Sequence, residues 1–146
     1  MDISDAYVLN AQVIVTKAEN AEKYKDAEGI KEAAIAVESG SAGESEASAV
    51  ATNVIPVKTQ ADTLVEVKSG SADCAVIDIT MAKAMTGEGT DYEGLTYTGS
   101  LSEEYYGIGF RKGADTCAEV NKIIAELKAD GSLQKLADKY GVNLAE

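Results

Sequence analysis

The chain has 146 residues, with 13 Lys and Arg against 25 Asp and Glu, so its formal net charge is −12. A chain this acidic and without a basic run is not expected to bind nucleic acid or an anionic membrane, since both are negatively charged. Hydrophobic residues make up 45% of the sequence. That share can build a core and excludes wholesale disorder.

The predicted elements alternate between strand and helix along most of the chain. In chain order they are a strand at 11–15, a charged loop with a short helix at 17–32, a strand at 33–37, a helix at 42–50, a strand at 54–57, a helix at 61–68, a strand at 74–77, a helix at 80–85, a glycine-rich loop at 87–94, a strand at 105–110, a helix from 116 to about 131, and a short helix carrying Leu133, Leu136, Ala137 and Tyr140. This alternation predicts a three-layer α/β fold, in which helices flank a mainly parallel sheet.

Three local features refine these elements. Pro56 cannot donate to a neighbouring strand, which places 54–57 at an edge of the sheet. The strand at 74–77 is apolar throughout, as expected of a strand covered on both faces. Thr116 with Glu119 three residues later predicts a capping box at the start of the long helix.

Residues with catalytic or metal-binding chemistry are scarce. Histidine is absent, which removes the commonest general base and metal ligand. Cys74 and Cys117 form no C-x-x-C motif, and the sequence allows them to be small buried residues or a disulfide. Ser132 and Lys135 match S-x-x-K without its companion motifs, and the glycines at 87, 89 and 94 miss the G-x-G-x-x-G spacing. No metal or cofactor is predicted.

Two strand ends carry candidate binding groups, because ligands of open α/β sheets bind beyond the carboxyl ends of the strands. The turn at 38–44 has small residues at a helix start, where open backbone N–H groups suit a carboxylate. An ordinary turn with a serine cap explains the same residues. Asp78 directly follows an apolar strand, so its carboxylate suits an ammonium group or a cap on the helix near Thr80. Together the two ends suit a zwitterion.

Five segments of the sequence, taken in chain order, resemble those of a known protein family. They are Ser4-Asp5-Ala6-Tyr7, 35–44 (IAVESGSAGE), 67–78 (VKSGSADCAVID), 106–113 (YGIGFRKG), and Val120-Asn121 followed by 129–133 and 139–141. In this order they resemble the amino-acid-binding proteins that serve ABC importers, the solute-binding proteins of family 3. The resemblance covers nearly the whole chain.

The resemblance implies one lobe of a periplasmic-binding-protein-like clamshell, which traps a polar amino acid and delivers it to an ABC permease. It implies that Ser41 and the backbone N–H of Ala42 bind the ligand carboxylate, and that Asp78 binds the α-ammonium. The remaining implied ligand-binding residues, which belong to the turn or line the side-chain pocket, are Glu38, Ser39, Gly40 and Gly43.

Family members carry a long segment before the Ser-Asp-x-Tyr stretch, which builds most of the first lobe and its carboxylate-clamping arginine. The chain is therefore expected to be a single second lobe, either a cut piece or a natural one-lobed relative. It would comprise a crossing strand at 1–16, an α/β lobe at 17–112 and C-terminal helices at 113–146. Half of the ligand contacts would give weak binding.

The loss of the first lobe also predicts an oligomer. The helix face that carries Cys117, Val120, Ile124 and Leu127 would lack its usual partner, and an uncovered apolar stripe tends to find another surface. We therefore expect a homodimer formed through the C-terminal helices.

The expected cellular location depends on the N-terminal sequence and on the family resemblance. No basic segment followed by an apolar one opens the chain, and no apolar stretch approaches the roughly 20 residues that span a bilayer. The residues alone are compatible with a cytoplasmic protein or with one whose signal peptide is removed, whereas the resemblance implies a periplasmic protein or a cell-surface lipoprotein.

Two other functions share the fold: a ligand-sensing module of a receptor, and a dehydratase-like enzyme with Glu38 as its acid or base.

Overall fold

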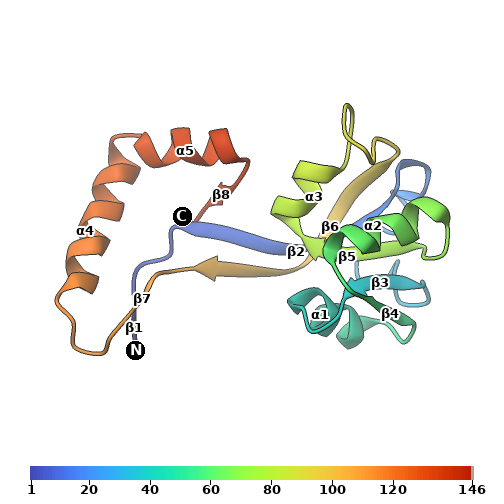
Figure 1. Cartoon of the computed structure of the whole chain (residues 1–146), viewed down its shortest axis with the longest axis horizontal. Helices are drawn as coiled ribbons and strands as arrows, with labels where there is room; N and C mark the ends of the chain where they lie inside the picture. The colour runs from blue at the N-terminus through green and yellow to red at the C-terminus, as the bar shows by residue number, and fades with distance from the viewer. Residues whose placement is uncertain (146) are drawn as a thin grey trace. The chain divides into compact units, whose positions relative to one another are not determined.

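The computed structural model describes residues 1–145, which form two compact units (Figure 1). Residues 11–103 form the sheet unit, and residues 1–10 with 104–146 form the terminal unit. The elements in chain order are β1 (Asp2–Ile3), β2 (Val8–Lys17), the 3-10 helix η1 (Ala18–Asn20), β3 (Ile35–Glu38), α1 (Ala42–Val50), β4 (Val54–Val57), α2 (Gln60–Ser69), β5 (Cys74–Asp78), α3 (Ile79–Met85), β6 (Leu95–Tyr106), β7 (Gly109–Phe110), α4 (Thr116–Ala129), α5 (Ser132–Tyr140) and β8 (Asn143–Leu144).

The predicted α/β class is confirmed, and the sheet is mixed. Its strand order is β4-β3-β5-β2-β6, with β8 pairing with β2. Strand β3 pairs in parallel with β4 and β5, because a helix follows each of β3 and β4 and returns the chain to the same starting edge. Strand β2 pairs antiparallel with β5. Strand β4, which contains Pro56, lies at the edge as predicted.

The core of the sheet unit lies on both faces of the sheet, which confirms the three-layer prediction. Along β2, Val13 and Val15 belong to one buried cluster and Ile14 to the other, since successive side chains of a strand point to opposite faces. The first cluster includes Leu64 of α2, and the second includes Ala47 of α1. Because β5 is covered on both faces, its apolar sequence needs no alternation.

The strand β6 is the largest element that the sequence prediction missed. A strand was expected at 105–110, whereas β6 runs over Leu95–Tyr106 and only Gly109–Phe110 pairs separately, as β7. Most of β6 carries Thr, Ser, Glu and a glycine, which give no apolar strand signal. Gly99 is required there, because an added Cβ would collide with the backbone carbonyl of Lys25.

The capping prediction at the long helix is wrong. Helix α4 has Asp115 at its N-cap, with helical backbone angles and no side-chain cap, so Thr116 already lies in the first turn. A capping box instead starts α2, where the Thr59 hydroxyl accepts from Asp62 N–H and the Asp62 carboxylate accepts from Thr59 N–H. The short helix predicted at 17–32 is limited to η1 and turns.

Both cysteines are free in the structure; Cys74 is buried, as the first interpretation expects, whereas Cys117 is half-buried. Cys74 is fully buried in β5, and burial raises the pKa of its thiol to about 12, with a smaller contribution from Asp73. The folded-state pKa exceeds the ordinary value of 9.0, so this thiol contributes stability that is full below pH 9 and lost as the pH rises toward 12.

We predict that the unfolding free energy of the Cys74→Ala variant falls less at alkaline pH than that of the parent chain. Between pH 8 and pH 10.5 the buried thiol accounts for about 2 kcal/mol of lost unfolding free energy, from a shift of about three pKa units. Urea unfolding at the two pH values measures it, with Cys117→Ala as the control. An equal loss in the Cys74→Ala variant and the parent chain would contradict the prediction.

The terminal unit has little core of its own. Strands β1 and β7 pair antiparallel, and the Lys128 ammonium donates to the carbonyls of Ala6 and Ala145 at 3.2 and 2.9 Å. Both buried hydrophobic clusters lie in the sheet unit. Most of the large hydrophobic side chains that are exposed belong to the terminal unit, namely Met1, Ile3, Tyr105, Tyr106, Ile108, Ile123, Leu136 and Tyr140.

The predicted uncovered stripe on α4 is partly wrong. Ile124 is buried, and Cys117, Val120 and Leu127 are half-buried. The large hydrophobic residue of α4 that is exposed is Ile123, at 50%. Within residues 1–145, no helix has both the length and the apolar character needed to traverse a bilayer.

Candidate ligand-binding site

The candidate site lies where β3 and β5 end at the same edge of the sheet. Val37 pairs with Val76 in parallel register, so the residues that follow both strands leave the sheet together. The turn after β3 leads into α1, and Asp78 closes β5. This is the edge at which ligands of open α/β sheets bind.

The Asp78 carboxylate is held by two glutamine side chains. Gln12 of β2 donates from Nε2 to one carboxylate oxygen at 2.7 Å, and Gln60 of α2 donates from Nε2 to the other at 2.7 Å. Gln60 also accepts from the backbone N–H of Asp78 at 3.2 Å. These three hydrogen bonds fix the Asp78 carboxylate in place between β2 and α2.

The capping interpretation of Asp78 is wrong. Asp78 occupies the N-cap position of α3, but its side chain makes no capping hydrogen bond to that helix. The carboxylate is instead directed to residues of β2 and α2.

Ser41 and Ala42 form the start of α1. The Ser41 hydroxyl accepts from the N–H of Glu44 at 3.1 Å, which is the ordinary serine cap that the sequence also allowed. Its own hydrogen remains available as a donor. Ala42 and Gly43 occupy the first two helical positions, where backbone N–H groups have no acceptor within the helix. The first turn of α1 therefore presents several donors at one point, which suits an anion.

Gly43 brings the start of α1 close to the end of β5. A Cβ added at Gly43 would lie 2.6 Å from the carbonyl oxygen of Val76 and 3.1 Å from Oε1 of Gln12. Gln12 is 3% exposed and contacts both groups of the site, since its amide nitrogen binds Asp78 and its amide oxygen lies beside Gly43. The donor-rich turn and the carboxylate are therefore neighbours.

The other predicted residues lie in this turn, between β3 and α1. Glu38 is the half-buried last residue of β3, and Ser39 is exposed, with its N–H donating to the carbonyl of Val57. Gly40 is exposed and adopts a φ of 77°, which glycine tolerates. Its N–H donates to the Glu44 carboxylate at 2.6 Å, so this N–H is already occupied.

Sequence reasoning missed Gln12 and Gln60. Gln12 is the one polar residue in the apolar run 11–15, and a buried amide in such a run indicates a hydrogen-bonding partner in the core. Gln60 follows Thr59, and the capping box of α2 fixes its position. Neither residue lies near Asp78 in sequence, so their pairing with it depends on the strand order.

The arrangement offers donors for a carboxylate beside a fixed carboxylate for a cation. Across residues 1–145, no group of three or more Cys, Asp or Glu side chains could hold a metal ion. Hydrogen-bond donors at the start of α1 and the Asp78 carboxylate match the two charged groups of a small zwitterion.

Comparison with protein families gives one match that spans almost the whole chain. Residues 1–143 match the family described as bacterial extracellular solute-binding proteins, family 3. The arginine-binding extracellular protein ArtP of Bacillus subtilis (strain 168) is 27% identical over 147 residues, which cover 96% of this chain and 56% of that protein.

Solved structures give the same result for the fold. A mutant of ArgBP from T. maritima is 30% identical, with a TM-score of 0.73 over 95% of this chain and 61% of that chain. A mutant of arginine-bound ArgBP matches with 30% identity and a TM-score of 0.66, over 86% of this chain and 59% of that one. The L-cystine solute receptor of Neisseria gonorrhoeae is 25% identical, with a TM-score of 0.78 over 95% and 59%. The chain spans about six tenths of the length of these relatives.

Proposed function

Because the chain belongs to the bacterial extracellular solute-binding proteins of family 3, we propose that it binds the carboxylate and ammonium of a free amino acid. The Ser41 hydroxyl and the Ala42 N–H bind the carboxylate, and Asp78 binds the ammonium. The observation that carries the proposal is the Asp78 carboxylate, fixed by Gln12 and Gln60 beside the first turn of α1.

We further propose that the preferred ligand has a cationic side chain. ArtP is an arginine-binding protein, and ArgBP is arginine-bound. Glu38, which follows the buried part of β3, takes part in no ion pair among the described residues. Its carboxylate is available for a guanidinium or ammonium, and a net charge of −12 favours the approach of a cation.

The same family supports a role in import and a location outside the cytoplasm. We propose that the whole protein is the extracytoplasmic component of an ABC importer, either periplasmic or a cell-surface lipoprotein, and that it hands its ligand to a permease. The residues of this chain bind part of the ligand only, so we expect weak affinity.

A calorimetric screen of the chain against the common amino acids tests the binding proposal. We expect saturable binding, strongest for L-arginine or L-lysine. Agmatine, which lacks the carboxylate, and the α-hydroxy analogue of arginine, which lacks the ammonium, should each bind at least about tenfold more weakly, because each loses one charge-assisted interaction. Equal binding of agmatine and L-arginine would contradict the proposed role of α1.

Two other functions of this fold are outcomes of the same experiments. Turnover of prephenate or arogenate by the chain would favour a dehydratase-like enzyme, with Glu38 as its acid or base. Binding of an amino acid in a protein that is fused to a signalling domain would favour a sensor. Neither alternative has an observation in this structure that favours it over binding for import.

We predict that the chain forms a homodimer through the exposed apolar residues of the terminal unit. Light scattering after size exclusion should give twice the mass of one chain, and Ile123→Ser with Leu136→Ser should shift the protein toward the monomer, since both side chains are about half exposed. Val65→Ser, at an equally exposed residue of the sheet unit, is the matched control. A monomer at high concentration would contradict the prediction.

A further inference from the structure

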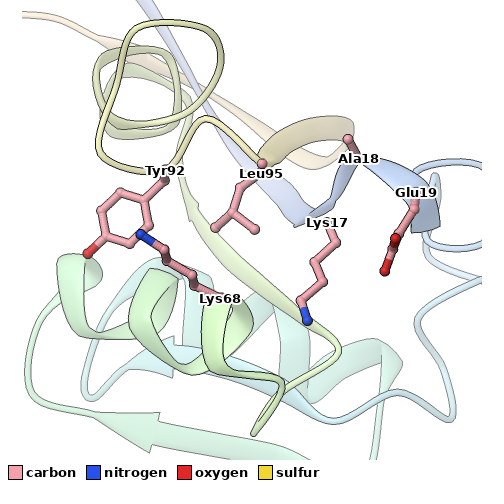
Figure 2. A pocket seen from close by; sticks show the side chains of 7 residues that line it. Lys17, Ala18, Glu19, Lys68, Tyr92 and Leu95 are labelled. Atoms are coloured by element: carbon pink, nitrogen blue, oxygen red, sulfur yellow. The ribbon is translucent and has the colours of Figure 1, made fainter.

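A pocket lies in the sheet unit at the opposite end of the sheet from Asp78. Strand β2 runs antiparallel to β5, so Gln12 pairs with Asp78 at one end and Thr16 pairs with Cys74 at the other. The pocket begins at that far end and has a volume of about 430 Å³ (Figure 2). Its lining residues are Lys17, Ala18, Glu19, Lys68, Tyr92, Gly94 and Leu95.

The pocket is lined by apolar side chains and by two lysines, Lys17 and Lys68. Leu95 is 3% exposed and belongs to the buried core, with Tyr92 packed against the same cluster. Figure 2 shows the Leu95 side chain between the Tyr92 ring and Lys17, with Lys68 crossing in front of the ring. Neighbouring backbone fixes the wall, because Ala18 N–H donates to the carbonyl of Gly94 at 3.0 Å.

Lys68 is held in position by the loop that precedes β6. Its ammonium donates to the carbonyl of Asp91 at 3.0 Å and lies 5.4 Å from the centroid of the Tyr92 ring. Such a contact favours a cation over the ring face. Lys68 also lines a neighbouring pocket of about 360 Å³ with Val65 and Tyr92, so the apolar surface continues past it along α2.

Neither cation of the pocket has an acidic partner. Among residues 1–145, no carboxylate oxygen lies within 4.0 Å of the Lys17 or Lys68 ammonium, although the chain holds 25 acidic residues. Glu19 is the one acidic residue of the lining, so the lining residues carry two positive charges and one negative charge. Two cations without acidic partners, next to an apolar surface, favour an amphipathic anion. Burial of its apolar part and attraction of its charge then both stabilise the same ligand.

We propose that this pocket binds a small carboxylate with an aromatic body. The aromatic ring packs on Leu95 and Tyr92, and the positive charges of Lys17 and Lys68 attract the carboxylate. The pocket is separate from the amino-acid site, because it uses none of the residues at the Asp78 end of the sheet.

An NMR titration of the ¹⁵N-labelled full chain with phenylacetate tests the proposal, with phenylacetamide as the neutral analogue. We expect saturable shifts at residues 17–19, 68 and 92–95. Lys17→Gln and Lys68→Gln should each raise the Kd for phenylacetate by about twofold to fivefold, the range for an exposed charge pair. Lys112→Gln, at an exposed lysine of the terminal unit, should leave the Kd unchanged.

Asp78→Asn separates this pocket from the amino-acid site, because phenylacetate binding should persist in that variant. Four results would each overturn the proposal. They are the absence of saturable shifts, equal affinity for phenylacetamide, an unchanged Kd in both lysine variants, and shifts centred on Ala42 and Asp78.

Discussion

Asp78→Asn is expected to weaken amino-acid binding by about 30-fold or more, the range for removing one charge of a hydrogen-bonded ion pair. The substitution keeps the size of the side chain and removes the negative charge that faces the ligand ammonium. Calorimetry with L-arginine measures the change, or with whichever amino acid the screen identifies as the tightest ligand.

The fold should survive this substitution at a small cost. In the parent chain, the side-chain amide nitrogens of Gln12 and Gln60 donate to the two Asp78 oxygens. In the variant, the NH₂ group of the new asparagine side chain replaces one of these oxygens, so one of the glutamine side chains loses its acceptor. Asp73→Asn is the matched control, because Asp73 precedes the other end of β5 and its oxygen still accepts from Ala34 N–H. Binding by Asp78→Asn within about threefold of the parent chain would show that Asp78 does not hold the ammonium.

Gly43→Val is expected to lower the unfolding free energy by about 3 kcal/mol, at the upper end of the range for overpacking a filled site. The first added carbon would lie 2.6 Å from the carbonyl oxygen of Val76, and a strand carbonyl cannot move aside as a flexible side chain can. It would also lie 3.1 Å from Gln12, which holds Asp78. We therefore expect amino-acid binding to weaken in the same variant.

Urea unfolding measures the change in stability, and Gly94→Val is its control. Gly94 has an ordinary φ and no heavy atom within 4 Å of an added Cβ. Gly43→Ala gives a smaller step of the same kind. Helix propensity alone would make Gly43→Ala stabilising by about 1 kcal/mol, so a gain of that size would contradict the close packing of α1 on β5.

The sequence predicts the helices and the buried strands of the sheet unit well, because their signals are local. The helix at 42–50 begins and ends as predicted, and β5 is apolar as a doubly covered strand should be. The polar strand β6 was missed because its ladder depends on β2, which lies about 80 residues earlier in the chain. Its Gly99 has a reason only once the backbone of Lys25 packs against it.

The candidate site, too, has residues that the sequence indicates locally and residues that only the fold brings together. The turn at 38–44 and Asp78 stand out in the sequence, since each follows a strand directly. The glutamines that hold Asp78 come from β2 and α2, 66 and 18 residues away, and only the strand order brings them to it. The choice between a helix cap and an ammonium ligand was therefore open in the sequence, and the structure excludes the cap.

An NMR titration of the full chain with L-arginine tests the proposed amino-acid site most directly. We predict saturable shifts of the backbone N–H signals of Ala42, Gly43 and Asp78, together with the side-chain amide signals of Gln12 and Gln60. These are the groups that contact the ligand or hold the residue that does. Absence of saturable shifts at these groups, or shifts confined to the Lys17–Lys68 pocket, would contradict the proposed site.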